Sequence, residues 1–267
     1  MNKAAQTATN WISLLQSELK NEGLQGRLIH EDGFRLLVID EDQLYLNLIP
    51  LNNQCHPFQL IRLQESYHLH QKKCIHLWED VWQTRSPQVL ARIKSLLGDN
   101  IRIHGRKTRV VKLDKPVADL FLAQNHLQGS VSSRYKLGLF EKESLVAVAT
   151  FSALRKMKHS DNYKSAELIR FAVKAGYSVT GGLSKLLKHF ADQYQPDDIM
   201  SYADRDWSAG EAYNKLNFEF TNAIDPQYFY LDGEGKRKLK TDVCTSGKEV
   251  FNTGSLKFIW KCKDGKY

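Results

Sequence analysis

The sequence predicts a mixed α/β (α+β) fold in which helices flank a central mixed sheet, with a smaller α/β domain before it. The strongest observation is the segment 167–218, where an apolar strand leads through two glycines into an amphipathic helix, and a second strand ends at Asp204 before another helix. A second observation is three short strands, separated by turn residues, within the first 50 residues. The chain of 267 residues suffices for two such domains, which we expect at residues 1–105 and 106–267.

The first domain is expected to alternate helices and strands. Apolar residues at helical spacing from Trp11 to Leu19 predict a first helix, which Gly23 ends. The pattern then predicts strands at 24–29, 34–39 and 44–49, a helix at 58–71, a strand at 74–77, and a helix that Ser86-Pro87 begins and Gly98 ends.

The second domain is expected to contain more strands than helices. The predicted strands are 109–113, a hairpin of 135–140 and 144–151, then 166–173, 199–202, 218–221, 228–231 and 256–260. The predicted helices begin at Asp114 and then span 183–194 and 209–216.

Composition excludes several classes of protein. Hydrophobic residues at 42% and charged residues at 25% are typical of a globular chain and not of a disordered one. No apolar run approaches the roughly 20 residues that span a bilayer, and the N-terminus has no apolar signal core, so we expect a cytoplasmic protein. The four cysteines stand singly and predict neither a disulfide framework nor a metal site; they are Cys55, Cys74, Cys244 and Cys262.

The positive charge favours a polyanionic partner such as DNA. The formal net charge is +8 and the isoelectric point is near 9.2. The basic residues form three segments: Arg102, Arg106, Lys107, Arg109 and Lys112; Arg155, Lys156, Lys158 and His159; and Lys236, Arg237, Lys238 and Lys240. These segments form either one nucleic-acid-binding face or three solvated loops, and the sequence leaves both open.

Gly181 and Gly182 form the first candidate site. Two glycines at the start of a helix let backbone N–H groups point at a ligand, and the helix dipole adds positive charge, so a phosphate is favoured there. Ser184, in the first helical turn, adds a hydroxyl donor. The alternative is an ordinary strand-to-helix turn in which Ser184 is a satisfied polar group.

The order of elements from Arg109 to Leu231, with the helix that ends in AYNKLNF, resembles the GNAT superfamily of N-acyltransferases. The resemblance implies that two central parallel strands splay apart to admit acyl-CoA. It places the pyrophosphate on Gly181, Gly182 and Ser184, and it makes Tyr213 the group that protonates the departing thiolate. The turn, KAGYSVTGGLSK, departs from the family pattern Q/RxxGxG/A.

A closer resemblance is to the phage Mom group of GNAT-fold proteins, which modify the exocyclic amine of adenine in DNA. It is carried by FLAQNHLQGSVSSRYKLGLFEKESLVAVATFSALR, ELIRFAV, GGLSKLL and SYADRDWSAGEAYNKLNF. By this resemblance the functional positions are His126, Arg170, Ser184 and Asp204. Leu127 stands where the Mom group has a tyrosine.

Residue chemistry fits these positions. The His126 imidazole can act as a base or ligand, or serve as a structural hydrogen-bonding group. Arg170 lies in a strand that should be largely buried, where its guanidinium needs a carboxylate or phosphate partner. A phosphate partner makes Arg170 part of the cofactor site, whereas Asp204 as partner makes a structural ion pair that lines the crevice.

The N-terminal domain resembles the very-short-patch-repair type of nuclease through KKCIHLWEDVWQTRSPQVLARIKSLLG. Cleavage by such an enzyme needs carboxylates on neighbouring strands to hold magnesium. The corresponding strands read FRLLVI and LYLNLI, and the acids Asp40, Glu41 and Asp42 stand in the turn between them. We therefore expect a degenerate nuclease-like domain that is retained for nucleic-acid binding.

Together these observations predict a GNAT-fold N-acyltransferase-like enzyme, of the kind carried by phages, that modifies an amine of a nucleic-acid base. The expected cofactor is acetyl-CoA or another acyl-CoA, and the expected partner is DNA. His126 or Asp204 would accept the proton of the amine, and Tyr213 would protonate the sulfur. The alternatives are a nucleic-acid-binding protein without catalysis and a homing-endonuclease-like nuclease that uses Asp40 to Asp42.

Overall fold

The computed structural model describes residues 3–157, 162–241 and 247–262. Contacts divide the chain into two compact units. Unit 1 comprises residues 1–97, 204–209 and 223–255, and unit 2 comprises 98–203, 210–222 and 256–267. The sequence placed one boundary near residue 105, whereas the units change at Leu97 and two C-terminal segments join unit 1. No helix within the described ranges is long and apolar enough to cross a membrane.

Unit 1 is built on a four-stranded sheet of order β1-β2-β3-β4. Its elements are α1 (Lys3–Asn21), β1 (Gly26–Glu31), β2 (Phe34–Ile39), β3 (Leu44–Ile49), α2 (Pro57–Leu69), β4 (Lys73–Trp78) and α3 (Glu79–Leu96). Only β3 and β4 pair in parallel, while the other neighbours are antiparallel. Helix α3 begins earlier than predicted and is kinked at Arg85, because the ring of Pro87 restricts the backbone before it.

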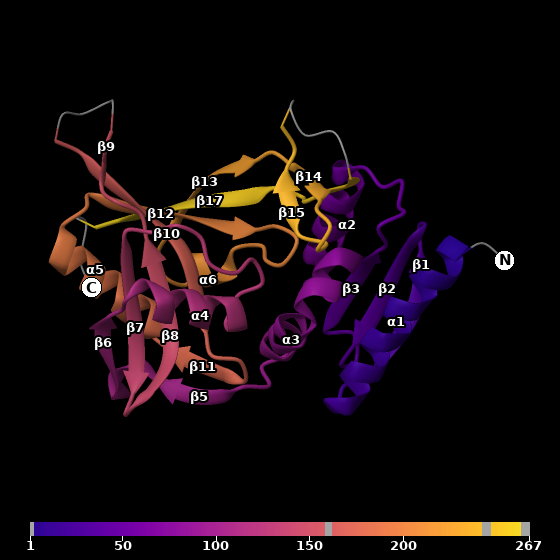
Figure 1. Ribbon diagram of the computed structural model, residues 1–267, viewed down its shortest axis with the longest axis horizontal. Helices are drawn as coiled ribbons and strands as arrows, with labels where there is room; N and C mark the ends of the chain where they lie inside the picture. Colours follow the sequence, from indigo (N-terminus) through magenta and orange to yellow (C-terminus); the bar gives the residue numbers. More distant parts are fainter. Residues whose placement is uncertain (1–2, 158–161, 242–246, 263–267) are drawn as a thin grey trace. The chain divides into compact units, whose positions relative to one another are not determined.

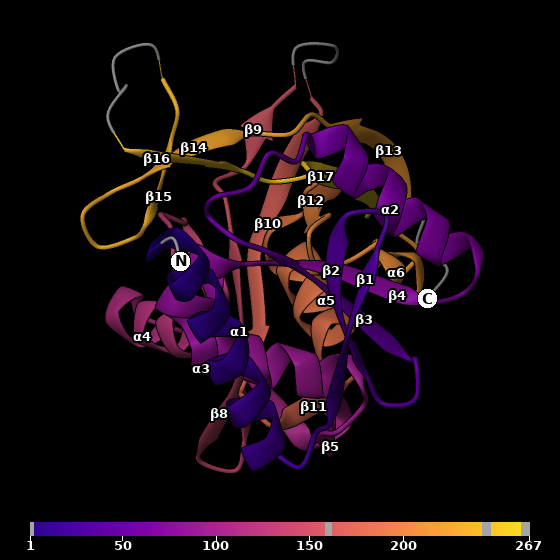
Figure 2. The ribbon, with the colours of Figure 1, turned by 90° about the vertical axis from the view of Figure 1, so that its right-hand side faces the viewer.

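Helices cover both faces of this sheet. Leu63 and Tyr67 of α2 pack on Leu36, Tyr45 and Cys74, which share one face through the alternation of strand residues. Figure 2 shows α2 on this side of the sheet and α1 with α3 on the other. Apart from Asn47, the buried residues of β2 and β3 are apolar on both faces, which explains why these two strands read as nearly continuous apolar runs.

The chain returns to unit 1 through a three-stranded sheet of order β15-β14-β16. Its strands are β14 (Tyr228–Leu231), β15 (Arg237–Leu239) and β16 (Lys248–Phe251). The Arg237 guanidinium donates to both carboxylate oxygens of Asp80, at 2.7 and 3.0 Å. Phe251 packs edge-on against Trp78, with ring centroids 4.8 Å apart. A buried bidentate ion pair and an aromatic contact therefore fasten this sheet to the N-terminal part of unit 1.

Unit 2 is built on a mixed sheet of order β13-β17-β12-β10-β8-β7-β6, with β9 beside β10. Its strands are β6 (Thr108–Lys112), β7 (Tyr135–Glu141), β8 (Ser144–Phe151), β9 (Arg155–Lys156), β10 (Lys164–Val173), β12 (Asp198–Asp204), β13 (Glu219–Ile224) and β17 (Ser255–Lys261). Its helices are α4 (Lys115–Asn125), α5 (Gly182–Tyr194) and α6 (Glu211–Asn214). The predicted fold class is confirmed: helices flank a central mixed sheet, and a smaller α/β sheet precedes it.

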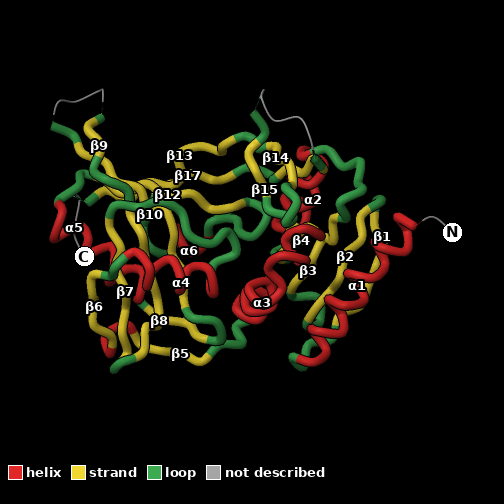
Figure 3. The backbone as a smooth tube through the Cα atoms, in the orientation of Figure 1, coloured by secondary structure: helices red, strands yellow, loops and turns green. Residues whose placement is uncertain are grey.

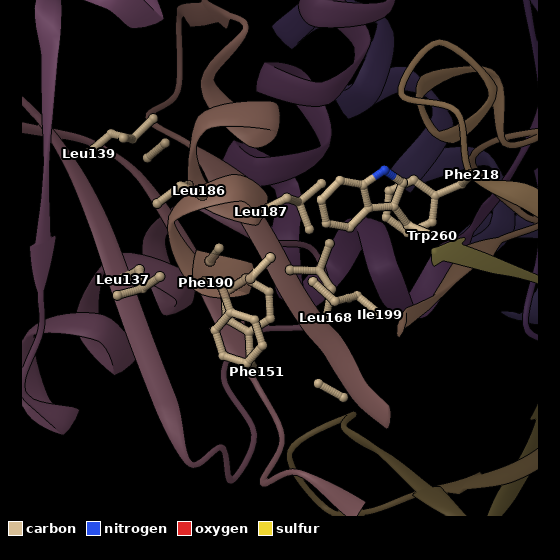
Figure 4. Packing of buried hydrophobic residues seen from close by; sticks show 14 of the residues in the cluster. Leu137, Leu139, Phe151, Leu168, Leu186, Leu187, Phe190, Ile199, Phe218 and Trp260 are labelled. Atoms are coloured by element: carbon tan, nitrogen blue, oxygen red, sulfur yellow. The ribbon is translucent and has the colours of Figure 1, made fainter. Parts of the chain in front are cut away.

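Helices α4 and α5 lie on opposite faces of the sheet of unit 2. Phe121 and Leu122 of α4 pack with Val148 and Ala172, and Figure 3 shows α4 crossing β7 and β8. On the other face, Phe190 of α5 stacks on Phe151 at 4.0 Å between centroids. Figure 4 shows these rings in the middle of the apolar cluster. The two faces of the sheet therefore have separate cores.

Three features of unit 2 differ from the sequence prediction. The two-residue strand β9 lies where only a basic segment was noted. The pattern also missed a small parallel pair, β5 (Ile101–His104) with β11 (Tyr177–Thr180), because each strand has only four residues. The predicted helix 209–216 is shortened to α6, since Gly210 with φ 87° precedes it and Asn217 with φ 58° follows it.

Candidate active site

The central feature of unit 2 is a pair of parallel strands that separate. Strands β10 and β12 pair only at Ser165↔Asp198, Ala166↔Ile199 and Glu167↔Met200, although both strands continue beyond this point. We call the separated parts the splay. Beyond Glu167, β10 remains paired with β8 on its other side. Beyond Glu167, side chains replace the ladder at the first two carbonyls of β10: Leu168 accepts Ser201 Oγ at 3.0 Å, and Ile169 accepts Nη1 of Arg170 at 2.9 Å.

A β-bulge in β10 lies at the start of the splay. The register with β8 shifts between Leu168 and Arg170. Leu168 packs in the core on the α5 face, whereas Ala172, an even number of residues further on, packs in the core on the α4 face. The bulge thus turns the side chains that follow it to the opposite face, which is the usual effect of one extra residue.

Side chains fix both ends of the short ladder. At its start, the Asp198 carboxylate accepts hydrogen bonds from Ser165 Oγ at 2.5 Å and from Tyr163 Oη at 2.6 Å. Lys261 Nζ in turn donates to Tyr163 Oη at 2.8 Å. At its end, Ser201 Oγ donates to the Leu168 carbonyl at 3.0 Å. The point where the strands separate is therefore set by hydrogen bonds at both ends.

Tyr213 lies at this point. Its hydroxyl is 2.9 Å from Ser201 Oγ, and its ring stacks on Phe258 with centroids 5.1 Å apart and 20° between the planes. Gly210, just before α6, allows this packing: a Cβ there would lie 2.3 Å from Cζ of Phe258. The sequence prediction singled out Tyr213, and the structure brings its hydroxyl to the start of the splay.

The glycine turn forms the N-terminus of α5. Gly181 is exposed, has φ 72°, and no atom lies within 4 Å of a Cβ built there. Gly182 is buried against Val179, and a Cβ would approach Cγ1 of Val179 to 2.7 Å. Ser184 is half-buried in the first turn of the helix. The turn therefore exposes the N-terminal end of a 13-residue helix, which is the backbone arrangement that favours an anion.

Lys185 does not add its charge to this turn. Its ammonium donates to the carbonyl oxygens of Gly105, at 3.1 Å, and Thr108. Gly105 belongs to the 3-10 helix η1 (Gly105–Lys107), which packs directly against the turn: a Cβ at Gly105 would lie 2.9 Å from the Thr180 carbonyl. Lys185 thus holds η1 in place.

His126 and Arg170 are joined through one loop on the α4 face. His126 caps the C-terminus of α4, and its Nδ1 accepts the backbone N–H of Gln128 at 3.1 Å. The carbonyl of Gly129, three residues on, accepts Nε of Arg170 at 3.3 Å. The structure therefore brings His126 and Arg170 to one region, while Ser184 belongs to the helix on the other face.

Asp204 belongs to unit 1 by its contacts, whereas Arg170 belongs to unit 2. Its Oδ1 accepts the backbone N–H of Asp206 at 3.0 Å, and its carbonyl accepts that of Trp207 at 3.1 Å. Within unit 1 the Asp204 side chain thus stabilises the turn that follows β12. The expected pairing of Asp204 with Arg170 stays a prediction.

Two residues that the sequence did not single out lie at the start of the splay. Glu167 is the last β10 residue of the ladder, and its carboxylate is 3.7 Å from Nη2 of Arg155. Burial, followed by the charge of Glu167, raises the pKa of Tyr202 on β12. Ser201 is the other missed residue. A single acid in the apolar run ELIRFAV is a signal that identifies Glu167, whereas nothing local distinguishes Ser201.

Thiolate chemistry is not supported by the three described cysteines. Burial raises the pKa of Cys74 and Cys262 to about 12, and it also raises that of Cys55. Cys244 lies outside the described residues. At neutral pH these three thiols stay protonated and are poor nucleophiles.

The three basic segments differ. The third is largely neutralised: Lys236, Lys238 and Lys240 each lie within 3.7 Å of an acid, and Arg237 binds Asp80. The first segment is exposed on β5, η1 and β6. In the second, Arg155 and Lys156 are exposed on β9, which Figure 1 shows projecting beyond the sheet at the start of β10. Lys158 and His159 lie outside the described residues.

The acids of the N-terminal domain have structural roles. Asp40, Glu41 and Asp42 form an exposed turn in which all three have positive φ, and among the described residues no group of acids, histidines and cysteines is arranged to hold a metal ion. Glu79 accepts the backbone N–H of Leu51 at 2.8 Å, and Asp80 binds Arg237.

Comparison with protein-family models gives no match, and comparison with curated proteins gives none. Among solved structures, the ribosomal-protein-S18-alanine N-acetyltransferase of Escherichia coli is 15% identical with a TM-score of 0.38, and the match covers 58% of this chain and 94% of that one. Arabidopsis thaliana Naa50, in complex with the bisubstrate analogue CoA-Ac-MVNAL, is 13% identical with a TM-score of 0.39, over 58% and 99% of the two chains. YncA of Salmonella typhimurium, a putative acetyltransferase with its cofactor acetyl-CoA, is 12% identical with a TM-score of 0.37, over 60% and 97%.

At these identities and TM-scores the likeness assigns neither an acceptor nor a catalytic residue to this chain. The central sheet of unit 2 has the strand arrangement that the sequence resemblance led us to expect. Its two middle strands, β10 and β12, are parallel neighbours that separate, and β10 is followed by the glycine turn and α5, as the sequence resemblance implied.

Proposed function

We propose that unit 2 is an N-acyltransferase that uses acyl-CoA and acylates an amine of a nucleic-acid base. The observation that carries the proposal is the splay, because β10 and β12 stop pairing after Glu167 and Met200 at the point where the hydroxyl of Tyr213 lies. A thioester held in the splay would have its reacting carbon beside this hydroxyl.

The two ends of an acyl-CoA find matching groups in unit 2. The N-terminus of α5 at Gly181 offers backbone N–H groups and a positive helix end to the pyrophosphate, with Ser184 as a further donor. The amide-bearing arm of acyl-CoA can pair with the edge of β10, as an added strand does. Arg170 lies on the α4 face and would meet a phosphate only at the splay.

The chemistry requires one proton acceptor and one proton donor. The amine nitrogen forms a bond to the acyl carbon, the carbon–sulfur bond breaks, the amine loses a proton, and the sulfur gains one. Tyr213 is suited to donate to the sulfur because of its position. Glu167 and His126 are candidate acceptors from unit 2, and Asp204 remains a third. Glu167 is favoured by its place at the ladder end beside Arg155.

The positive charge of β9 is our reason for proposing a nucleic acid as the substrate that accepts the acyl group. Arg155 and Lys156 are exposed on β9, which pairs with β10 at Ser165 and Lys164, next to the closed end of the splay. A cationic strand beside the reacting point favours a polyanionic acceptor, and single-stranded DNA fits because its base amines are accessible without a duplex.

The glycine turn provides a matched test of acyl-CoA binding. Asn and Asp both tolerate the left-handed backbone of Gly181, and the open space there accepts either side chain, so Gly181→Asn and Gly181→Asp differ mainly in charge. We expect calorimetry to show that Gly181→Asp weakens acetyl-CoA binding about tenfold more than Gly181→Asn, the effect of one carboxylate beside a pyrophosphate. Equal affinities of the two variants, or no binding to the unsubstituted protein, would contradict the proposal.

The acceptor is tested by mass spectrometry of nucleosides from single-stranded DNA incubated with the protein and acetyl-CoA. We expect an acetylated base that disappears with Tyr213→Phe. A protein that binds DNA with a steep salt dependence but leaves its bases unmodified would instead be a nucleic-acid-binding protein without catalysis, which the exposed charges of β9 also fit.

A further inference from the structure

Ser201 connects the splay to Tyr213. It is 2% exposed and lies on β12 directly after Met200, the last residue that pairs with β10. Its Oγ lies 3.0 Å from the Leu168 carbonyl and 2.9 Å from the hydroxyl of Tyr213. One buried hydroxyl therefore contacts both the strand edge at the start of the splay and the proposed acid.

The direction of these two hydrogen bonds follows from proton counting. The Leu168 carbonyl has no proton and can only accept, so it takes the single proton of the Ser201 hydroxyl. The oxygen of Ser201 can then only accept from Tyr213. In this arrangement the hydroxyl oxygen of Tyr213 is held at one place at the start of the splay. When the sulfur leaves, the Tyr213 proton turns from Ser201 to the sulfur, and Ser201 turns its own proton from the Leu168 carbonyl to the Tyr213 oxygen.

The aromatic contacts of Tyr213 fix the plane of its ring, and the hydrogen bond to Ser201 fixes the position of its hydroxyl oxygen. Phe258 stacks on its ring and Phe218 meets it edge-on, with centroids 5.1 and 5.2 Å away. Such contacts define the plane of the ring, but they are weakly directional along it, whereas a hydrogen bond fixes an atom to a few tenths of an ångström.

We propose that Ser201 is a positioning residue that holds the Tyr213 hydroxyl where the leaving sulfur forms, an inference that rests on the proposed acyltransferase function. Ser201 does not touch the substrate in this role. The loss of its hydroxyl leaves acyl-CoA binding intact and slows the chemical step, because the Tyr213 oxygen then lacks the hydrogen bond that holds it at the start of the splay.

The test uses the full chain with four changes: Ser201→Ala, Ser201→Thr, Tyr213→Phe, and the double variant Ser201→Ala with Tyr213→Phe. Thiol release from acetyl-CoA is measured with an adenine-containing single-stranded oligonucleotide, and in parallel with water as the acceptor. Ser201→Ala should lower kcat about fivefold to tenfold, the effect of one neutral hydrogen bond, with KM for acetyl-CoA unchanged within about twofold. Ser201→Thr, which keeps the hydroxyl, should restore most of the rate.

The double variant separates positioning from a general structural effect. If Ser201 acts through Tyr213, the double variant is no slower than Tyr213→Phe alone. Ser144→Ala, at an exposed position of β8, serves as the control for loss of a serine, and thermal unfolding checks that each variant is folded.

Failure of this inference differs from failure of the proposed function. The role of Ser201 is overturned if the protein is active and Ser201→Ala keeps its full kcat. It is also overturned if the reduction in kcat of the double variant equals the product of the two single reductions. Either result leaves the proposed acyltransferase function intact. A protein that does not bind acetyl-CoA, or that binds it without releasing thiol to either acceptor, overturns both.

Discussion

The main sheet of each unit contains a pair of adjacent parallel strands, β3 with β4 and β10 with β12, and the two pairs end differently. In unit 1, β3 and β4 pair at six successive positions, and in the middle of the ladder Asn47 Nδ2 lies 3.2 Å from His76 Nδ1. In unit 2, β10 and β12 pair at three positions and then separate. The first pair keeps its ladder along both strands, while the second gives it up at the place where we propose that a ligand binds.

The buried polar groups of the two units also differ in what they connect. In unit 1 the buried polar residues join parts of the fold: Asp80 binds Arg237, and Asp206 accepts both the amide and the hydroxyl of Thr253, at 3.0 and 2.6 Å. In unit 2 the hydroxyls of Ser201 and Tyr213 meet where the strands separate. These buried polar contacts therefore join distant segments of unit 1, whereas the contact in unit 2 lies where β10 and β12 separate.

The largest expected effect comes from breaking the Asp80–Arg237 pair. Asp80→Ala should lower the free energy of unfolding of unit 1 by about 3–5 kcal/mol, because it leaves a largely buried guanidinium without its carboxylate. Urea unfolding, with amide exchange to separate the units, measures this effect. The exposed pair Lys236–Glu234 is the control, and Glu234→Ala should change this free energy little. Equal losses for the two variants would show that the buried pair does not fasten the C-terminal sheet.

The second expected effect concerns His76 and pH. Burial, with a smaller contribution from the charge of Arg205, lowers the pKa of His76 from 6.5 to about 4. Between pH 6.5 and 4 the unfolded state therefore binds a proton at His76 that the folded state does not bind. The free energy of unfolding is not reduced by this difference above pH 6.5, and it decreases as the pH falls towards 4. The loss is on the order of 3 kcal/mol.

His76→Gln tests this, since glutamine can still hydrogen-bond Asn47 but does not titrate. The variant should lose less unfolding free energy than the unsubstituted protein between pH 6.5 and 4, whereas His30→Gln, at an exposed position of β1, should behave like the unsubstituted protein. Parallel pH profiles for all three proteins would mean that His76 is protonated at the same pH in both states.

The third and smallest effect is at the closed end of the splay. Asp198→Ala removes the acceptor of Ser165 and Tyr163 and should cost about 1–3 kcal/mol, with faster amide exchange at residues 165–167 than in β3 and β4. The exposed Asp192→Ala is the control. Unchanged exchange in the short ladder would show that its three backbone pairs hold the strands without Asp198.

The sequence predicts the local elements well and the long-range contacts poorly. The hairpin of β7 and β8, strands β1 to β4 and the glycine turn all have local signals in periodicity, turn residues and helix starts, whereas β15 and β16 were not predicted. The return of residues 204–209 and 223–255 to unit 1 has no such signal, because it depends on partners far along the chain, such as Arg237 with Asp80.

The candidate site shows the same limit. Tyr213 and the glycine turn were predicted from resemblance and from helix chemistry, and the structure brings the Tyr213 hydroxyl to the splay. Ser201 could not be predicted, since a serine inside SYAD is unremarkable until the geometry shows that its hydroxyl reaches the Leu168 carbonyl. Asp204 reads as a strand-end acid in the sequence, but its described contacts hold a turn of unit 1.

The order in which the chain is synthesised has a consequence for unit 1. Its first stretch ends at Leu97, but Arg237, Phe251 and the other partners of that stretch belong to residues 204–209 and 223–255. At translation speeds of roughly 5–20 residues per second, residues 98–255 take on the order of 10–30 s to emerge. During that interval Asp80 and Trp78 have no partner from the C-terminal sheet, so unit 2 can complete most of its sheet before the unit that begins the chain is finished.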